Sequence, residues 1–111
     1  MNIGNEERPL KFGFNQSIFY CEQRDITITQ MNIDLAKIST DMGVFRDVIW
    51  SALKEGARQD GKEFEFTVFD VGDWLQEIEA KEVTGAINEL TGSMPKAKKK
   101  VKPKVYPVSS Q

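Results

Sequence analysis

The amino-acid sequence predicts a small, mainly α-helical single domain with a short N-terminal β-strand or hairpin and a disordered basic C-terminal tail. Three observations support this fold class. Apolar residues recur at helical spacing in about four segments, a phenylalanine-rich stretch near the N-terminus alternates like a strand, and the composition changes after Gly92. We therefore expect residues 1–92 to form the helical domain and residues 93–111 to form the tail.

The stretch PLKFGFN predicts the first regular element. Leu10, Phe12 and Phe14 alternate with polar or small residues, which is the period of a half-buried strand. We expect the eight mostly polar residues before it to lack regular structure. A short helix then follows from Gln16 to about Arg24, with Asn15 as its N-cap.

A second helix is predicted from Gln30 to about Ser39, and a third after Asp41. The segment Ile26–Thr29 alternates like a strand but is short, so we favour a bend into the second helix, with Thr29 as its cap and Met31, Leu35 and Ile38 buried. In the third, capped by Asp41, the sequence VFRDVIWSALKEGARQ predicts a buried stripe, and Asp60-Gly61 ends it. This stripe contains Phe45, Val48, Ile49, Ala52 and Leu53.

The C-terminal half of the domain is predicted to contain one short strand and two more helical segments. KEFEFTV alternates with Phe64 and Phe66 on one side and can pair with the first strand. Thr67 caps a helix whose buried face contains Val71, Trp74, Leu75 and Ile78. The last helix runs from about Ala80 to Leu90, ends at Gly92, and buries Val83, Ala86, Ile87 and Leu90.

The carboxylates of VFDVGDWLQEIEA raise the question of an acidic active site. Asp70, Asp73 and Glu77 point away from the predicted apolar face, and the two aspartates also suit the positive end of the helix dipole. We therefore interpret these acids as the solvated side of an amphipathic helix, and we predict no catalytic residues.

The residue types exclude several classes of site. The chain has no histidine and one cysteine, so a Cys–His or Ser–His–Asp catalytic arrangement and a tetrahedral structural zinc site are excluded. We expect no metal and no cofactor. Cys21 is predicted to pack as a small hydrophobic residue. The sequence has no apolar run of signal-peptide or membrane-spanning length, so we expect a soluble protein of a reducing cytoplasm, without a membrane partner.

The net charge of −2 hides a division between the domain and the tail. Nine basic and seventeen acidic residues precede Ser93, a net charge of −8, whereas the tail carries six lysines and no acid. These lysines, together with Tyr106, make nucleic-acid binding a competing hypothesis. The acidic domain would repel a phosphate backbone, so we favour a solvated tail or a tail that docks on an acidic partner. The lysines are Lys96, Lys98, Lys99, Lys100, Lys102 and Lys104.

Five aromatic residues are the sequence's candidates for a partner-binding surface. Trp50 is turned away from most of the stripe of its helix, so it either packs with Leu53 or is partly exposed, as interface aromatics are. Phe69 lies beside the predicted apolar face that contains Trp74. Phe19 and Tyr20 are adjacent on a helix, and we expect one of the two to point outward.

The order of these elements resembles the tail assembly chaperones of long-tailed bacteriophages and the related prophage and gene-transfer-agent proteins. The likeness spans about Leu10 to Lys100 and lies in the spacing of LKFGF, VFRDVIWSALKEGARQDGK, FDVGDWLQEI and INELTGSMPKAKKK. WSALKEG and VGDWL are the most specific local matches.

The resemblance implies a mostly helical, non-catalytic protein of the host cytoplasm that is absent from the mature virion. Such chaperones coat the helical tape measure protein, keep it soluble and recruit tail tube subunits, and many self-associate into homo-oligomers. In many phages a ribosomal frameshift extends the product, and Lys98-Lys99-Lys100 fits an A-rich slippery run. The alternatives are a nucleic-acid-associated regulator that uses the lysine tail, and a minor connector or tail-completion component of the virion.

Overall fold

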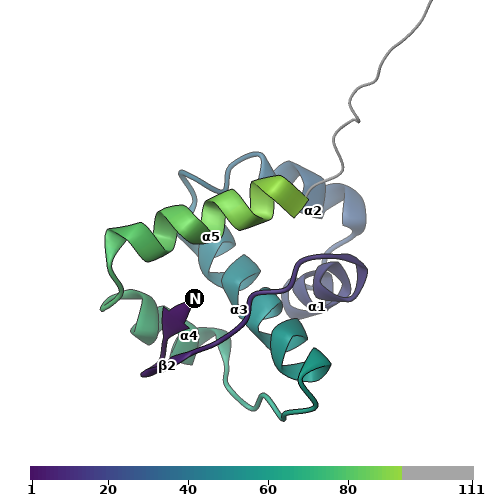
Figure 1. Cartoon of the computed structure of the whole chain (residues 1–111). Coiled ribbons are helices and arrows are strands. Elements are labelled where there is room, and N and C mark those ends of the chain that lie inside the picture. Colours follow the sequence, from purple (N-terminus) through teal and green to yellow (C-terminus); the bar gives the residue numbers. More distant parts are fainter. Residues whose placement is uncertain (94–111) are drawn as a thin grey trace, which may run out of the picture.

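The computed structural model describes residues 1–93, and these residues form a helical domain with a small N-terminal hairpin (Figure 1). The predicted mainly helical domain with a short N-terminal hairpin is therefore confirmed, and the predicted tail lies outside the described residues except for Ser93. In chain order the elements are β1 (Asn2–Ile3), β2 (Glu6–Glu7), α1 (Phe14–Arg24), α2 (Ile28–Leu35), α3 (Met42–Gln59), α4 (Val68–Leu75) and α5 (Ala80–Ser93).

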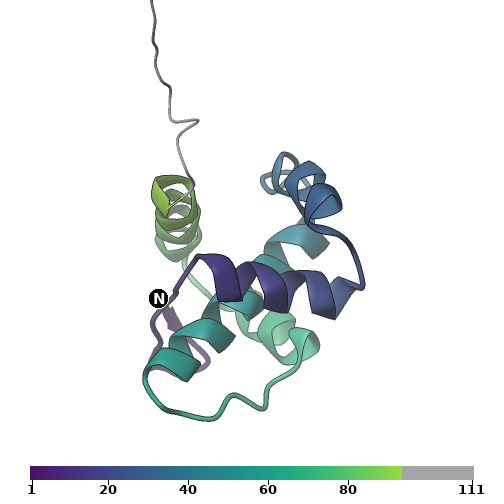
Figure 2. The same ribbon diagram turned by 90° about the vertical axis from the view of Figure 1, so that its right-hand side faces the viewer.

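Helix α3 is the centre of the fold, and α1, α4 and α5 are arranged around it (Figures 1 and 2). Asp41 caps it as predicted, because its Oδ1 accepts a hydrogen bond from Val44 N at 3.1 Å. The predicted stripe lies in the core, although Phe45 is only half-buried. Val48, Ile49, Ala52 and Leu53 are each no more than 2% exposed.

The hairpin lies before the segment predicted to be a strand. Residues 2–3 pair with residues 6–7 in antiparallel fashion, across a turn in which Gly4 and Asn5 have φ values of 62° and 68°. Positive φ at both central residues is what a type I′ turn requires, and glycine and asparagine adopt it most easily. The prediction that the first eight residues lack regular structure was therefore wrong, and Gly4-Asn5 was the signal for the turn.

Neither Leu10–Phe14 nor the stretch around Phe64 and Phe66 is a strand. The first segment packs on a helix instead of on another strand: Lys11 N donates to the Ala52 carbonyl at 3.2 Å. The Pro9 carbonyl oxygen lies so close to Gly56 that a Cβ there would be 2.2 Å from it. Contact with α3 replaces the pairing that the alternation predicted.

Helices α1 and α2 begin two residues earlier than their predicted starts. Helix α1 follows Gly13, whose N–H donates to Gln16 Oε1 at 3.3 Å, so Asn15 lies inside the helix and not at its cap. Helix α2 is capped by Thr27, whose Oγ1 accepts from Gln30 N at 3.1 Å, and it ends at Leu35. The predicted cap Thr29 therefore lies in the first turn of α2.

Helices α4 and α5 follow the predicted pattern with shifted ends. Thr67 and Asp70 form a reciprocal capping box at the start of α4. The predicted face of α5 points inward, with Ala86 and Leu90 buried. Helix α5 continues through Gly92 to Ser93. The expected stop at Gly92 was wrong, since a glycine near a helix end costs only about 1 kcal/mol relative to alanine.

Candidate functional site: an apolar groove between α1 and α2

An open groove of about 890 Å³ lies between α1 and α2, and we refer to it as the α1–α2 groove. One wall is a stripe of α1 in which successive side chains recur at helical spacing: Phe14, Ser17, Ile18, Cys21, Glu22 and Asp25. The other wall is a stripe of α2 at the same spacing: Ile28, Met31, Asn32 and Leu35. Phe12, Gly13, Gln16, Ile26 and Leu90 complete the lining. The groove therefore consists of two facing helix surfaces.

The rim of the groove exposes large apolar side chains. Phe14 is 83% exposed, Ile28 56% and Ile18 39%. Met31 and Leu90 are buried beneath them. An aromatic or aliphatic side chain left in water forgoes the stabilisation that burial gives, so a contiguous rim of this kind indicates an interaction surface.

The groove stays open because α1 uses its opposite face to pack on α3. Gln16 lines the groove but is itself buried, and its Nε2 donates toward α3, to Ser51 Oγ, at 2.8 Å. Tyr20 is fully buried on the same side. Phe19 is half-buried and lies under the Lys54 ammonium, which is 4.6 Å from the ring centroid. Because this face packs in the core, no part of residues 1–93 covers the stripe of Phe14 and Ile18.

A buried polar network fixes the angle between α1 and α2 beneath the groove. Tyr20 Oη donates to Asp34 Oδ2 at 2.9 Å, and Gln30 Nε2 donates to Asp34 Oδ1 at 2.9 Å. Arg24 lies 3.6 Å from the same carboxylate and also donates to Asp47 Oδ2 at 2.8 Å, which links both helices to α3. The hydrogen bond from Gln30, followed by that from Tyr20, lowers the pKa of Asp34 against the effect of burial, so the network holds a charged carboxylate. Burial, with the Asp34 hydrogen bond, raises the pKa of Tyr20.

Cys21 lies on the α1 wall and is half-buried, in agreement with its prediction as a small packing residue. Burial is the main cause that raises the pKa of its thiol, and the Asp34 charge adds to it. A raised pKa keeps the thiol protonated and unreactive near neutral pH.

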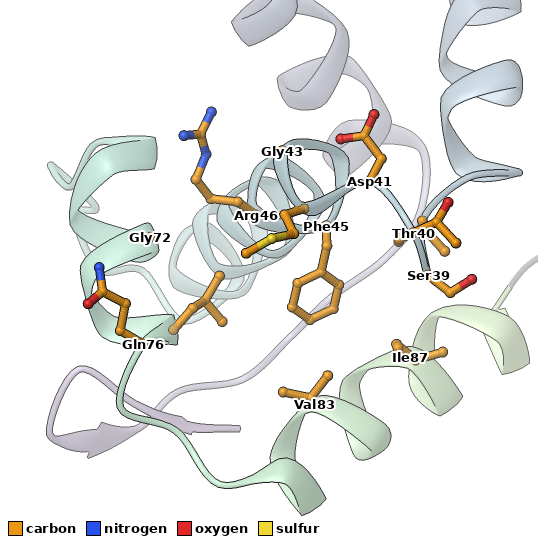
Figure 3. Close-up of a pocket in the computed structure, with 13 residues that line it drawn as sticks. Ser39, Thr40, Asp41, Gly43, Phe45, Arg46, Gly72, Gln76, Val83 and Ile87 are labelled. Atoms are coloured by element: carbon orange, nitrogen blue, oxygen red, sulfur yellow. The ribbon is translucent and has the colours of Figure 1, made fainter.

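A second, smaller apolar surface lies between α3, α4 and α5 (Figure 3). It surrounds a pocket of about 450 Å³, into which Phe45 of α3 points toward Val83 on α5. Met42, 86% exposed, lies at its edge, and the Arg46 guanidinium lies 5.3 Å from the centroid of the 71% exposed Phe69 ring. Arg46 also pairs with the buried Asp47 at 2.8 Å. This surface is apolar, but a cation held over Phe69 covers part of it.

The structure separates the five aromatic candidates into exposed and buried residues. Phe69 is exposed as expected, and Phe19 and Trp74 are half-buried. Trp50 is only 7% exposed, and its Nε1 donates to the Phe66 carbonyl at 2.8 Å. Tyr20 is 0% exposed. Of the two alternatives for Trp50 the structure therefore has the buried one, and Tyr20 is the buried member of its pair with Phe19. In each residue the polar atom of the ring donates a hydrogen bond within the domain.

Trp74 packs beneath the N-terminal hairpin. Its ring lies 4.8 Å from the Phe66 ring, edge to face, and the Arg8 guanidinium lies 4.7 Å from its centroid. A Cβ on Gly4 would be 2.9 Å from the indole. The N-terminal hairpin thus closes this part of the domain.

Phe14 and Ile28 were not identified as site residues from the sequence. The alternation around Phe14 predicts a strand and the pattern around Ile28 predicts a bend, so the sequence places neither residue on a helix surface. Had α1 been started at Phe14, the spacing of Phe14, Ile18 and Cys21 would have indicated a second stripe, distinct from that of Gln16 and Tyr20.

The six lysines of the tail, as well as Tyr106, lie outside the described residues. Within residues 1–93 there is no cluster of three or more histidine, cysteine or acidic side chains that could hold a metal ion. No helix in this part of the chain is long and apolar enough to cross a membrane. Asp70 is the capping residue of α4, and Asp73 and Glu77 are solvent-exposed.

Comparison with known proteins gives no family assignment. No protein-family model matches the chain, and no curated protein or solved structure matches it significantly.

Proposed function

We propose that the chain is a non-catalytic phage tail assembly chaperone that covers apolar helices of a tape measure protein in the α1–α2 groove and helps to recruit tail tube subunits. The observation that carries the proposal is the open groove with Phe14, Ile18 and Ile28 on its rim. Two helix walls with an apolar surface between them are the arrangement that accepts a third amphipathic helix, whose apolar side chains recur at i, i+3, i+4 and i+7.

The rigidity of the groove supports this proposal. The Tyr20–Asp34–Arg24 contacts hold α1 and α2 at a fixed angle, so the walls need not be ordered when a partner enters. A preformed surface loses less conformational entropy on binding than a flexible one. The chaperone must also release its cargo to the tail tube, and several moderate contacts along one long helical cargo allow that better than a single tight site.

The charge of the domain supports the same proposal. The −8 net charge of residues 1–92 gives a coated tape measure protein an acidic exterior. Like charges on neighbouring chaperones repel one another and oppose aggregation of the coated filament. The proposal places this protein in the host cytoplasm during assembly, as a homo-oligomer or a row of copies on the cargo, and outside the mature virion.

The test is co-expression with the tape measure protein that this proposal expects to be encoded near the gene. The double variant F14E/I28E should lose the soluble complex, because two carboxylates in the groove oppose burial of an apolar helix. Both substitutions lie in the first turn of a helix, where glutamate suits the dipole, so the fold should survive. Circular dichroism and a thermal melt check the fold, and the yield of soluble tape measure protein is the readout.

The control is F69E, which places one carboxylate on another exposed aromatic residue, outside the groove. Normal yield with F69E and lost yield with F14E/I28E supports the groove. The reverse result assigns the cargo to the surface around Phe69. A wild-type complex that dissociates steeply with added salt favours the nucleic-acid regulator, and stoichiometric recovery in purified particles favours a virion component.

A further inference from the structure

The α1 wall of the groove changes character along its length. Phe14 lies at the first residue of α1 and Ile18 one turn later, whereas Glu22 is in the last turn and Asp25 follows the helix end. With a rise of about 1.5 Å per residue, Phe14 and Asp25 are separated by about 16 Å along the axis. One end of this wall is therefore apolar and the other end is acidic.

The acidic end carries charge that the described part of the chain does not neutralise. Glu22 and Asp25 are both exposed, and neither has an ion-pair partner within residues 1–93. Arg24 lies between them in sequence but points to Asp47, away from the groove. Among the described residues that line the groove there is no lysine or arginine. A ligand that enters this groove meets apolar walls and, at one end, two free carboxylates.

We infer that the groove selects an amphipathic helix whose apolar stripe is followed at one end by lysine or arginine, placed over Glu22 and Asp25. This inference rests on the proposed function and adds the charge pattern of the cargo. The apolar stripe supplies most of the affinity, because pairs between exposed charges each change an equilibrium constant by only a few-fold. The charges decide which helix, and which end of it, occupies the acidic end of the groove.

The experiment measures binding of two fluorescent helical peptides to the full-length chain. Both peptides carry the same apolar stripe, and one has three lysines at one end where the other has three glutamates. We expect the lysine peptide to bind about tenfold more tightly at 10 mM salt. The ratio should shrink at 150 mM salt, where the Debye length falls from about 30 Å to about 8 Å.

The variant E22K/D25N tests the residues directly. Asparagine is chosen at position 25 because Asp25 has φ 55°, a conformation that asparagine tolerates and lysine does not favour. This variant should reduce the peptide preference to less than about twofold. The control E63K/D73N makes the same charge change at two exposed positions outside the groove, and should keep most of the preference.

The outcomes separate the inference from the proposed function. If both peptides bind equally well, the charge selection is wrong and the groove remains a helix-binding site. If neither peptide binds, the proposed function of the groove fails, and the inference fails with it. A third probe is a synthetic peptide of residues 94–111, which carries the six lysines. If it binds in the groove as tightly as the lysine peptide, the occupant is the chain's own segment, and the inference of a partner helix is overturned.

Discussion

Apolar side chains at helical spacing are buried around α3 but exposed to solvent at the α1–α2 groove. On α3, apolar side chains at helical spacing are covered on nearly all sides, and Ala52 has no exposed surface. On α1 and α2, apolar side chains at the same spacing form the rim of an open groove, and Phe14 is 83% exposed. The residue types and the period are alike, so they do not explain the difference.

The difference comes from what lies opposite each stripe. Helix α3 is covered by α1, by α4 and by the extended segment around Pro9 and Lys11, which reaches it from the hairpin. Within the described structure, only Phe12, Gly13, Leu90 and Ile26, which lies in the connection between the two helices, line the α1–α2 groove besides α1 and α2. Whether a helical stripe becomes part of the core or the wall of an open groove therefore depends on the path of segments far away in sequence.

The largest expected effect comes from the tightest contact around α3. In G56A, the new Cβ would lie 2.2 Å from the Pro9 carbonyl oxygen, so the N-terminal segment must move away from the helix. We expect a loss of about 2–3 kcal/mol in the free energy of unfolding, as for other overpacked positions. The measurement is chemical denaturation.

The matched control is G85A in α5, where a Cβ would have no atom within 4 Å. Alanine is favoured over glycine in a helix by about 1 kcal/mol, so this variant should be more stable than the wild type. Equal stability changes in G56A and G85A would show that the segment around Pro9 does not press on α3.

A smaller effect is expected where the core meets the floor of the groove. Y20F removes the hydroxyl that donates to Asp34 at 2.9 Å in a fully buried position, while Gln30 and Arg24 still contact that carboxylate. Hydrogen bonds to charged groups contribute about 1.5–3 kcal/mol, so we expect a loss near the lower end of that range. A thermal melt should show a decrease of roughly 6–12 °C. An unchanged melting temperature in Y20F would contradict the buried hydrogen bond.

The same contrast explains which features could be predicted from the sequence. The α3 stripe and the caps Asp41 and Thr67 depend on residues close in sequence, and all were identified correctly. The burial of Trp50 depends on the Phe66 carbonyl, sixteen residues away, and that of Tyr20 on Asp34, fourteen residues away. No local pattern contains these partners.

The groove was missed for a related reason. The alternation of Leu10, Phe12 and Phe14 matches a strand, but Gly13 is the N-cap of α1, so Phe14 belongs to the helix and projects into the groove. The two interpretations differ in whether Phe14 is the last residue of a strand or the first residue of α1. The acidic character of the domain and the apolar spacing within α1 and α2 can be predicted from the sequence. The groove between the two helices cannot, because it depends on how the helices are placed relative to each other.

The smallest effect on stability is expected on the groove rim, and it tests the comparison most directly. The double variant F14S/I28T removes two large apolar side chains that are mostly in water, so the free energy of unfolding should change by less than about 1 kcal/mol for the pair. Fluorescence of an apolar dye such as ANS, which binds exposed hydrophobic surface, should decrease in the folded protein.

A melting temperature lowered by more than about 8 °C would mean that the rim is covered in solution. If that loss grows with protein concentration, a second copy covers the rim, because only association between chains depends on concentration. If it does not, the cover comes from the same chain.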